Sequence, residues 1–253
     1  MNNKLIATSL LAVSLSVTAA AASAEIIVFD GNNGGTAKVG IVETATGANY
    51  GNPDVWGPVL NFSDFDVSGG KSVNDNLNFG AFDRADIVMA NVNQDLSPEH
   101  GGLGVCSEDP SCAGDSDSFS SNVSGYRSDE ILFFDFDELV SLDTVWFNGE
   151  HEELVDSDGG PMYQPSESLF NIYYSLDGSE YANAFANQLL PTDREFLSID
   201  VGAYQYWAIA ASGWGQHSSY VEAIAYTEVP EPSLWALMGL GLLGMGLARR
   251  RRS

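Results

Sequence analysis

The chain has 253 residues, of which 44% are hydrophobic and 11% aromatic, enough for one folded domain with a hydrophobic core. All 35 acidic residues lie between Glu25 and Glu231, whereas five of the ten basic residues, Lys4 and Arg249 to Arg252, lie outside that segment. The segment therefore carries 35 acidic against 5 basic residues, a net charge of −30. This charge excludes nucleic acid and anionic membrane surfaces as favourable partners.

The amino-terminal residues predict a secretory signal peptide. Lys4 supplies a positive start, residues 5–17 form an apolar centre, and Ala22-Ser23-Ala24 is a cleavage site of the A-x-A type. We expect signal peptidase to remove residues 1–24, which include the signal helix. The mature chain of an exported protein then begins at Glu25.

Residues 25–228 predict one all-β domain, in which short apolar or alternating runs are separated by Gly, Asp, Asn and Pro. The predicted strands are 25–29, 37–43, 55–65, 85–92, 130–136, 139–148, 169–175, 194–201, 204–211 and 219–227. Helical periodicity is confined to a turn or two near residues 180–190. Short strands at near-regular spacing favour an antiparallel β-sandwich of the jelly-roll kind.

Residues 101–128 form the longest irregular stretch, and they contain both cysteines, Cys106 and Cys112. An exported chain with two cysteines favours one disulfide between them. Metal ligation is the weaker alternative, because no second Cys or His pair has the spacing of a zinc site.

Two acidic loops offer the oxygen ligands that calcium takes. Asp115 and Asp117 lie in one loop, and Asp156 and Asp158 lie in the other. Neither loop matches an EF-hand, and Asx turns in solvated loops are the alternative interpretation. No other cofactor is predicted.

Trp214 lies between two glycines and close to His217, just before the last predicted strand. If the indole were exposed at the rim of a sandwich, it would offer an aromatic platform beside polar groups for contact with a glycan. The alternative is an indole that folds back over the core.

Catalytic constellations are scarce in this chain. It has three histidines and no G-x-S-x-G pattern, and His151-Glu152-Glu153 lacks the second histidine of a zinc-binding helix. We therefore expect a protein that is not an enzyme. A glycoside hydrolase, which needs only two carboxylates, remains the less favoured alternative.

The carboxyl-terminal residues combine three features in a fixed order. Val229-Pro230-Glu231-Pro232 is followed by an apolar run of sixteen residues, 233–248, and then by four arginines. The run is slightly shorter than the ~20 residues that usually span a bilayer, so it predicts a short transmembrane helix. The two prolines favour extended backbone just outside the membrane, which suits an enzyme that reads extended peptide.

This tail, residues 229–253, resembles the PEP-CTERM sorting tail of Gram-negative bacteria. The resemblance implies export, transient anchoring in the inner membrane and processing by an exosortase near Pro230 to Pro232. It also implies a cell-surface or extracellular-matrix protein, associated with exopolysaccharide or biofilm.

The end of the β domain resembles discoidin-like and galactose-binding-like jelly rolls. The resemblance lies in "YSLDGSEY", "YQYWAIAASG" and "YVEAIAY", between Leu169 and Tyr226, where an Asp-Gly pair predicts a tight hairpin. It implies a carbohydrate-binding module as the alternative function.

Overall fold

The structure of the chain is a computed structural model. It describes residues 23–30, 40–46, 49–50, 55–72, 80–96, 101–106, 119–121, 129–148, 168–189, 196–213 and 217–229.

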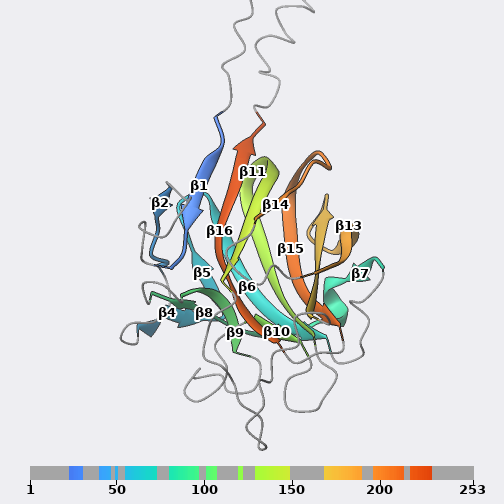
Figure 1. The fold of residues 1–253 in the computed structure, drawn as a ribbon, viewed down its shortest axis with the longest axis horizontal. Helices are drawn as coiled ribbons and strands as arrows, with labels where there is room; N and C mark the ends of the chain where they lie inside the picture. Colours follow the sequence, from blue (N-terminus) through green and yellow to red (C-terminus); the bar gives the residue numbers. More distant parts are fainter. Residues whose placement is uncertain are drawn as a thin grey trace, which may run out of the picture.

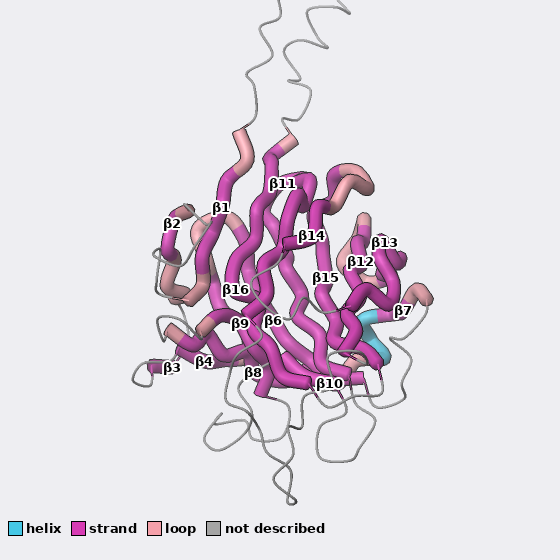
Figure 2. Tube along the Cα trace, in the orientation of Figure 1, coloured by secondary structure: helices cyan, strands magenta, loops and turns pink. Residues whose placement is uncertain are grey.

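Strands make up almost all the regular structure of these residues (Figures 1 and 2). The strands of the amino-terminal half are β1 (Glu25–Val28), β2 (Ile41–Val42), β3 (Asn49–Tyr50), β4 (Val55–Gly57), β5 (Val59–Asn61), β6 (Phe65–Ser72), β7 (Phe82–Asp83), β8 (Val88–Asp95), β9 (Gly102–Cys106) and β10 (Phe119–Ser121). Those of the carboxyl-terminal half are β11 (Asp129–Asn148), β12 (Ser168–Ser175), β13 (Glu180–Leu189), β14 (Phe196–Ser198), β15 (Ala203–Gly213) and β16 (His217–Glu228). A three-residue 3-10 helix, η2 (Arg84–Asp86), follows β7.

The twenty-residue strand β11 belongs to two groups of strands. Its first half pairs with β6 and β15, and its second half pairs with β16 and β14, all antiparallel. The register shifts between Asp135 and Val140, where residues 137–139 are exposed. We call residues 137–139 the β11 corner. From this corner one group continues through β15, β12 and β13, and the other through β16 and β1.

The main core lies between the two groups, because it contains residues of both, such as Ile27 and Ile224 with Val67 and Ile209. Its aromatic members are in contact with one another. The centroid of the Phe65 ring lies 4.9 Å from the centroid of the Phe136 ring and 6.2 Å from those of the Phe29 and Phe134 rings. Full burial of a Phe side chain contributes about 1.5–3 kcal/mol. These rings therefore carry much of the stability of the sandwich.

A second apolar cluster lies on the opposite face of the first half of β11. Along this strand Leu132 and Phe134 belong to the main core, whereas Ile131 and Phe133 belong to the second cluster with Phe82 and Tyr181. Successive side chains of a strand point to opposite faces. Both faces of β11 are covered here, which explains why "ILFF" shows no alternation of apolar and polar residues.

The predicted all-β class and antiparallel sandwich are confirmed. The helical turn predicted near residues 180–190 is wrong, since Glu180–Leu189 is the strand β13. Its pairing with β12 buries Tyr181 and covers part of the core with Ala184 and Phe185, and this tertiary packing overrides the helical preference of its alanines.

The predicted strands 130–136 and 139–148 are joined into the single strand β11. The Asp-Gly hairpin is confirmed between β12 and β13: Gly178 has φ of 74°, and a Cβ atom there would lie 3.1 Å from the ring of Tyr206.

Among the residues that the structure describes, no helix is long and apolar enough to cross a membrane. The predicted signal helix and the transmembrane helix 233–248 lie outside those residues.

Candidate functional site

The two ends of the described chain leave the sandwich at one pole. Strand β1 begins at Glu25 and runs antiparallel to β16, with Glu25 opposite Tyr226 (Figure 1). The β11 corner lies at the same end, because Val140 pairs with Glu228. We call the surface formed by Glu25, residues 226–229 and the β11 corner the exit pole.

Tyr226 is the anchor of the chain at this pole. Its side chain is fully buried, and the centroid of its ring lies 5.0 Å from that of Phe136 and 6.1 Å from that of Phe65. The hydroxyl donates a hydrogen bond to Oδ2 of Asp64 at 2.9 Å. Burial, and then the Asp64 carboxylate, raise the pKa of Tyr226 well above its usual value, so the phenol remains a donor.

Thr227 to Val229 follow this anchor and are held along β11. Thr227 and Glu228 pair with Ser141 and Val140, and the Val229 N–H donates to the carbonyl oxygen of Leu139 at 2.9 Å. The Thr227 hydroxyl donates to Oδ2 of Asp143 at 2.6 Å. Pairing and hydrogen bonds to β11 thus hold the chain as far as Val229.

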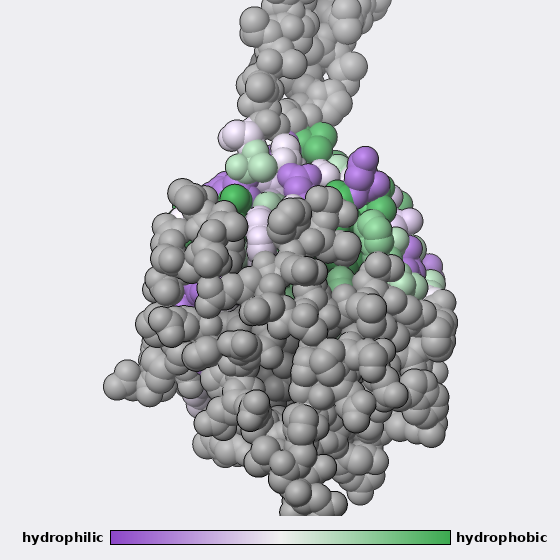
Figure 3. Space-filling view, viewed as in Figure 1, coloured by the Kyte–Doolittle hydropathy of each residue, from purple (hydrophilic) through white to green (hydrophobic). Residues whose placement is uncertain are grey.

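The surface of the exit pole is both acidic and apolar. Burial, followed by the charges of Asp64, Glu228 and Glu43, raises the pKa of Glu25. Leu139 and Val229 remain 38% and 41% exposed. Figure 3 shows hydrophobic and hydrophilic described residues side by side at this end of the molecule.

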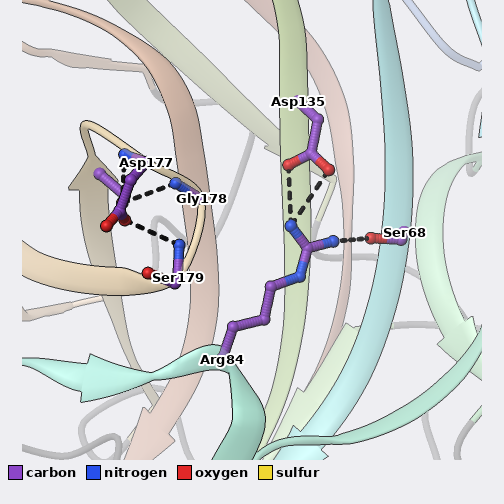
Figure 4. A network of polar contacts seen from close by, with 7 residues as sticks. Ser68, Arg84, Asp135, Asp177, Gly178 and Ser179 are labelled. Carbon is purple, nitrogen blue, oxygen red and sulfur yellow. Dashed lines mark hydrogen bonds and ion pairs between the residues drawn. The ribbon is translucent and has the colours of Figure 1, made fainter.

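A second polar network lies on the face of the second apolar cluster (Figure 4). Nη1 of Arg84 donates to both carboxylate oxygens of Asp135 at 3.1 Å, and Nη2 donates to the Ser68 hydroxyl at 2.7 Å. The guanidinium carbon lies 4.3 Å from the centre of the Phe133 ring. Burial raises the pKa of Asp135, and the Arg84 guanidinium, which pairs with this carboxylate, opposes the rise.

Arg84 also connects this network to the hairpin between β12 and β13. Its backbone N–H donates to the carbonyl oxygen of Ser179 at 2.8 Å. In the same turn, Asp177 accepts hydrogen bonds from the backbone N–H groups of Ser179 and Glu180. These bonds, that of Ser179 first, lower the pKa of Asp177 to about 2.

The chemistry of the Arg84 network is that of a structural clamp. Burial and then the Asp135 charge raise the pKa of the neighbouring Tyr181, which therefore stays protonated. Asp135 is engaged by Arg84, so the network presents neither a free base nor an activated nucleophile. Its physical effect is to fix β7 and η2 over the second cluster.

The predicted site residues fall mostly outside the described part of the chain: Ala22, Cys112, Asp115, Asp117, Asp156, Asp158, Trp214, Pro230, Glu231 and Pro232. Ala24 is exposed directly before β1, and Val229 follows β16. His217 is the first residue of β16, where it pairs with Ser121 of β10. Within the described stretches, no group of three or more His, Cys, Asp and Glu side chains could hold a metal ion.

Cys106 ends β9, is 2% exposed and carries no free thiol. Since Cys112 lies outside the described residues, the bond between the two cysteines stays a prediction.

Sequence reasoning missed Tyr226, Thr227 and Arg84 as positions of interest. A signal existed for Arg84, which is one of only five basic residues in the acidic segment. No local pattern distinguishes Thr227 from other strand residues, because its partner Asp143 is 84 positions away in the sequence.

Comparison with known proteins identifies the end of the chain. Residues 228–252 match the PEP-CTERM protein-sorting motif, so the motif starts at the last residue of β16. The chain thus carries the sorting signal of exported proteins that are transiently anchored in the membrane and processed by an exosortase.

No curated protein matches the chain in sequence. Two solved structures are similar to parts of it. One is a pectin-binding carbohydrate-binding module, with 14% identity and a TM-score of 0.26 over 41% of this chain and 69% of that one. The other is the C-terminal domain of a chitobiase from Bacteroides fragilis, with 11% identity and a TM-score of 0.37 over 68% of this chain and 99% of that one.

Proposed function

We propose that the protein is a non-enzymatic cell-surface or extracellular-matrix protein, associated with exopolysaccharide or biofilm and released from its membrane tail by exosortase. One observation carries the proposal: β16 leads directly into the sorting motif, with no linker between the folded domain and the signal. The β-sandwich is therefore the cargo of the sorting tail.

The arrangement of both ends supports this role. Signal peptidase acts before Glu25 and the exosortase acts beyond Glu228, and these two residues lie at the same pole. Removal of both tails leaves the rest of the sandwich free to face the matrix. The high negative charge keeps such copies soluble and apart until they meet a partner.

The test replaces Pro230, Glu231 and Pro232 with alanine. The variant should be exported and folded, because neither the signal peptide nor the described sandwich contains these residues. It should remain at full length in the inner membrane, whereas the parent and a matched Asp86→Ala control should appear outside the membrane at a shorter mass. If the triple variant reached the same compartment at the same short mass as the parent, the sorting role would be wrong.

A second candidate function is glycan binding, and a specific aromatic pair favours it. The half-buried rings of Tyr174 and Tyr204 stack with centroids 4.0 Å apart, and Trp207 packs against them edge-on. Rigid rings with hydroxyl groups suit contact with sugars.

Retention of the released protein on polysaccharide affinity gels tests this candidate. Tyr174→Ala and Trp214→Ala are compared with the parent, and Leu176→Ala, at an exposed hairpin position, serves as the control. Equal migration of the parent with and without polysaccharide in the gel would count against glycan binding.

A further inference from the structure

The last three described residues of the chain are attached to the sandwich on one side only. Strand β1 begins at Glu25, opposite Tyr226, so Tyr226 lies between β1 and β11. Within the described residues, Thr227 to Val229 have only β11 as a neighbouring strand. We call Thr227 to Val229 the exit segment.

The exit segment is held more weakly than the residue before it. Tyr226 is fully buried among Phe65 and Phe136, whereas Glu228 and Val229 are exposed and Thr227 is half-buried. Backbone pairing to β11 and the single side-chain bond from Thr227 to Asp143 hold the segment in place. Local opening from Val229 back to Thr227 therefore breaks few contacts and stops at Tyr226.

Little chain separates the exit segment from the apolar run. From Val229 to Ser233, where the apolar run begins, a fully extended chain spans at most about 14 Å. The polar headgroup layer takes up roughly 5–7 Å of that length on each side of a bilayer. In the anchored precursor the sandwich is therefore close to the headgroups. Between the exit segment and the apolar run, a membrane enzyme finds only Pro230, Glu231 and Pro232.

Opening of the exit segment does not lengthen the chain, because Thr227 to Val229 are already extended along β11. It releases their backbone N–H and C=O groups from β11. Three residues on the amino-terminal side of Pro230 can then enter an active site that binds extended peptide.

We propose that the exit segment regulates tail processing: it must open from β11 before the processing enzyme can cut, and Thr227 and Asp143 set how often it opens. This inference rests on the proposed function, because it assumes that the tail is cut. Thr227 acts here as a positioning residue, since it changes access to the tail and does not touch the reacting bond.

Thr227→Val tests the inference without changing the matched motif, which begins at Glu228. Valine keeps the shape of threonine and removes the hydroxyl that donates to Asp143. The rate at which full-length precursor turns into shortened protein, followed by pulse-chase labelling, should rise roughly threefold to tenfold, the range for loss of one side-chain hydrogen bond. Thr46→Val is the matched control, because it loses an exposed bond from Thr46 Oγ1 to Asn61 O and should process like the parent.

A spacer separates the effect on access from a general loss of stability. Six Gly and Ser residues inserted between Thr227 and Glu228, directly before the matched motif, supply unpaired chain on the amino-terminal side of Pro230, so this precursor should be processed faster than the parent. In the spacer background, Thr227→Val should then have no further effect. Asp143→Asn gives a second way to weaken the bond and should accelerate processing of the precursor without a spacer.

The outcomes distinguish this inference from the function on which it rests. If the parent is processed and the Pro-Glu-Pro alanine variant is not, the tail is a processing signal. Under that condition, equal or slower processing of both Thr227→Val and Asp143→Asn would overturn the role of the exit segment. An unprocessed parent, in cells that contain the enzyme, would instead overturn the proposed function itself.

Discussion

Replacement of Arg84 by alanine should lower the unfolding free energy of the sandwich by more than a substitution near the surface usually does. The substitution removes the ion pair with Asp135, the hydrogen bond to Ser68 and the contact with the Phe133 ring. The ion pair contributes about 1 kcal/mol, because its side chains are 23% and 31% exposed and water screens them. The bond to the nearly buried Ser68 hydroxyl and the cation–π contact contribute about 1 kcal/mol each.

The expected loss is therefore about 3 kcal/mol of unfolding free energy, or roughly 6–12 °C in Tm for a domain of this size. Thermal unfolding of the released protein at pH 7, followed by circular dichroism, measures it. Arg84→Lys should lose about half as much, because it keeps the charge but not the planar fork.

The loss should depend on pH. Burial raises the pKa of Asp135, and removal of Arg84 raises it further, so the ionised carboxylate opposes folding of the variant. This penalty is present at neutral pH and disappears as the pH falls through the raised pKa. The difference in Tm between parent and variant should therefore narrow in acid. Two results together would show that the Arg84 network has no energetic role. Arg84→Ala would melt within 1 °C of the parent, and Asp135→Asn would change the Tm by the same amount in the parent and in Arg84→Ala.

Three further predictions concern separate parts of the sandwich. Tyr226→Phe removes the donor to Asp64 and should lower the unfolding free energy by about 1–2 kcal/mol in urea titration; an unchanged midpoint would contradict the anchoring role. The fold lowers the pKa of Asp177 to about 2, so the stability that this carboxylate contributes is present above its unfolded pKa and is lost as the pH falls through about 2. Asp177→Ala should thus lower the Tm at pH 7 and approach the parent near pH 2, whereas a constant difference would refute the ionic origin. Replacement of Cys106 and Cys112 by serine should cost about 2–3 kcal/mol and leave the domain folded, and two free thiols in protein from the envelope would contradict the predicted disulfide.

The sequence was sufficient to predict the class of fold because strand signals are local. Alternation, turn residues and the Asp-Gly pair at Asp177 and Gly178 each involve neighbouring residues, and the hairpin at this pair is confirmed. The sorting tail was also predictable, since an enzyme reads it as a short linear signal.

The features that depend on distant residues were not predictable from one sequence. The exit segment needs Asp143, which lies 84 positions from Thr227, and the clamp joins Arg84 to Asp135 across 51 positions. Residues 180–190 show a turn or two of helical periodicity, and pairing with β12 and β7, which lie far away or across a turn in the sequence, makes Glu180–Leu189 the strand β13 instead. The joining of two predicted strands into β11 depends on the pairing partners on both sides of the β11 corner.

The intact mass of the protein recovered outside the inner membrane tests the central claim most directly. An exported and processed protein has lost both of its terminal signals, so its mass should correspond to a chain that begins at Glu25 and ends before Ser233. A mass that includes the apolar run 233–248 and the terminal arginines would contradict the claim, because the sandwich would then keep its membrane tail.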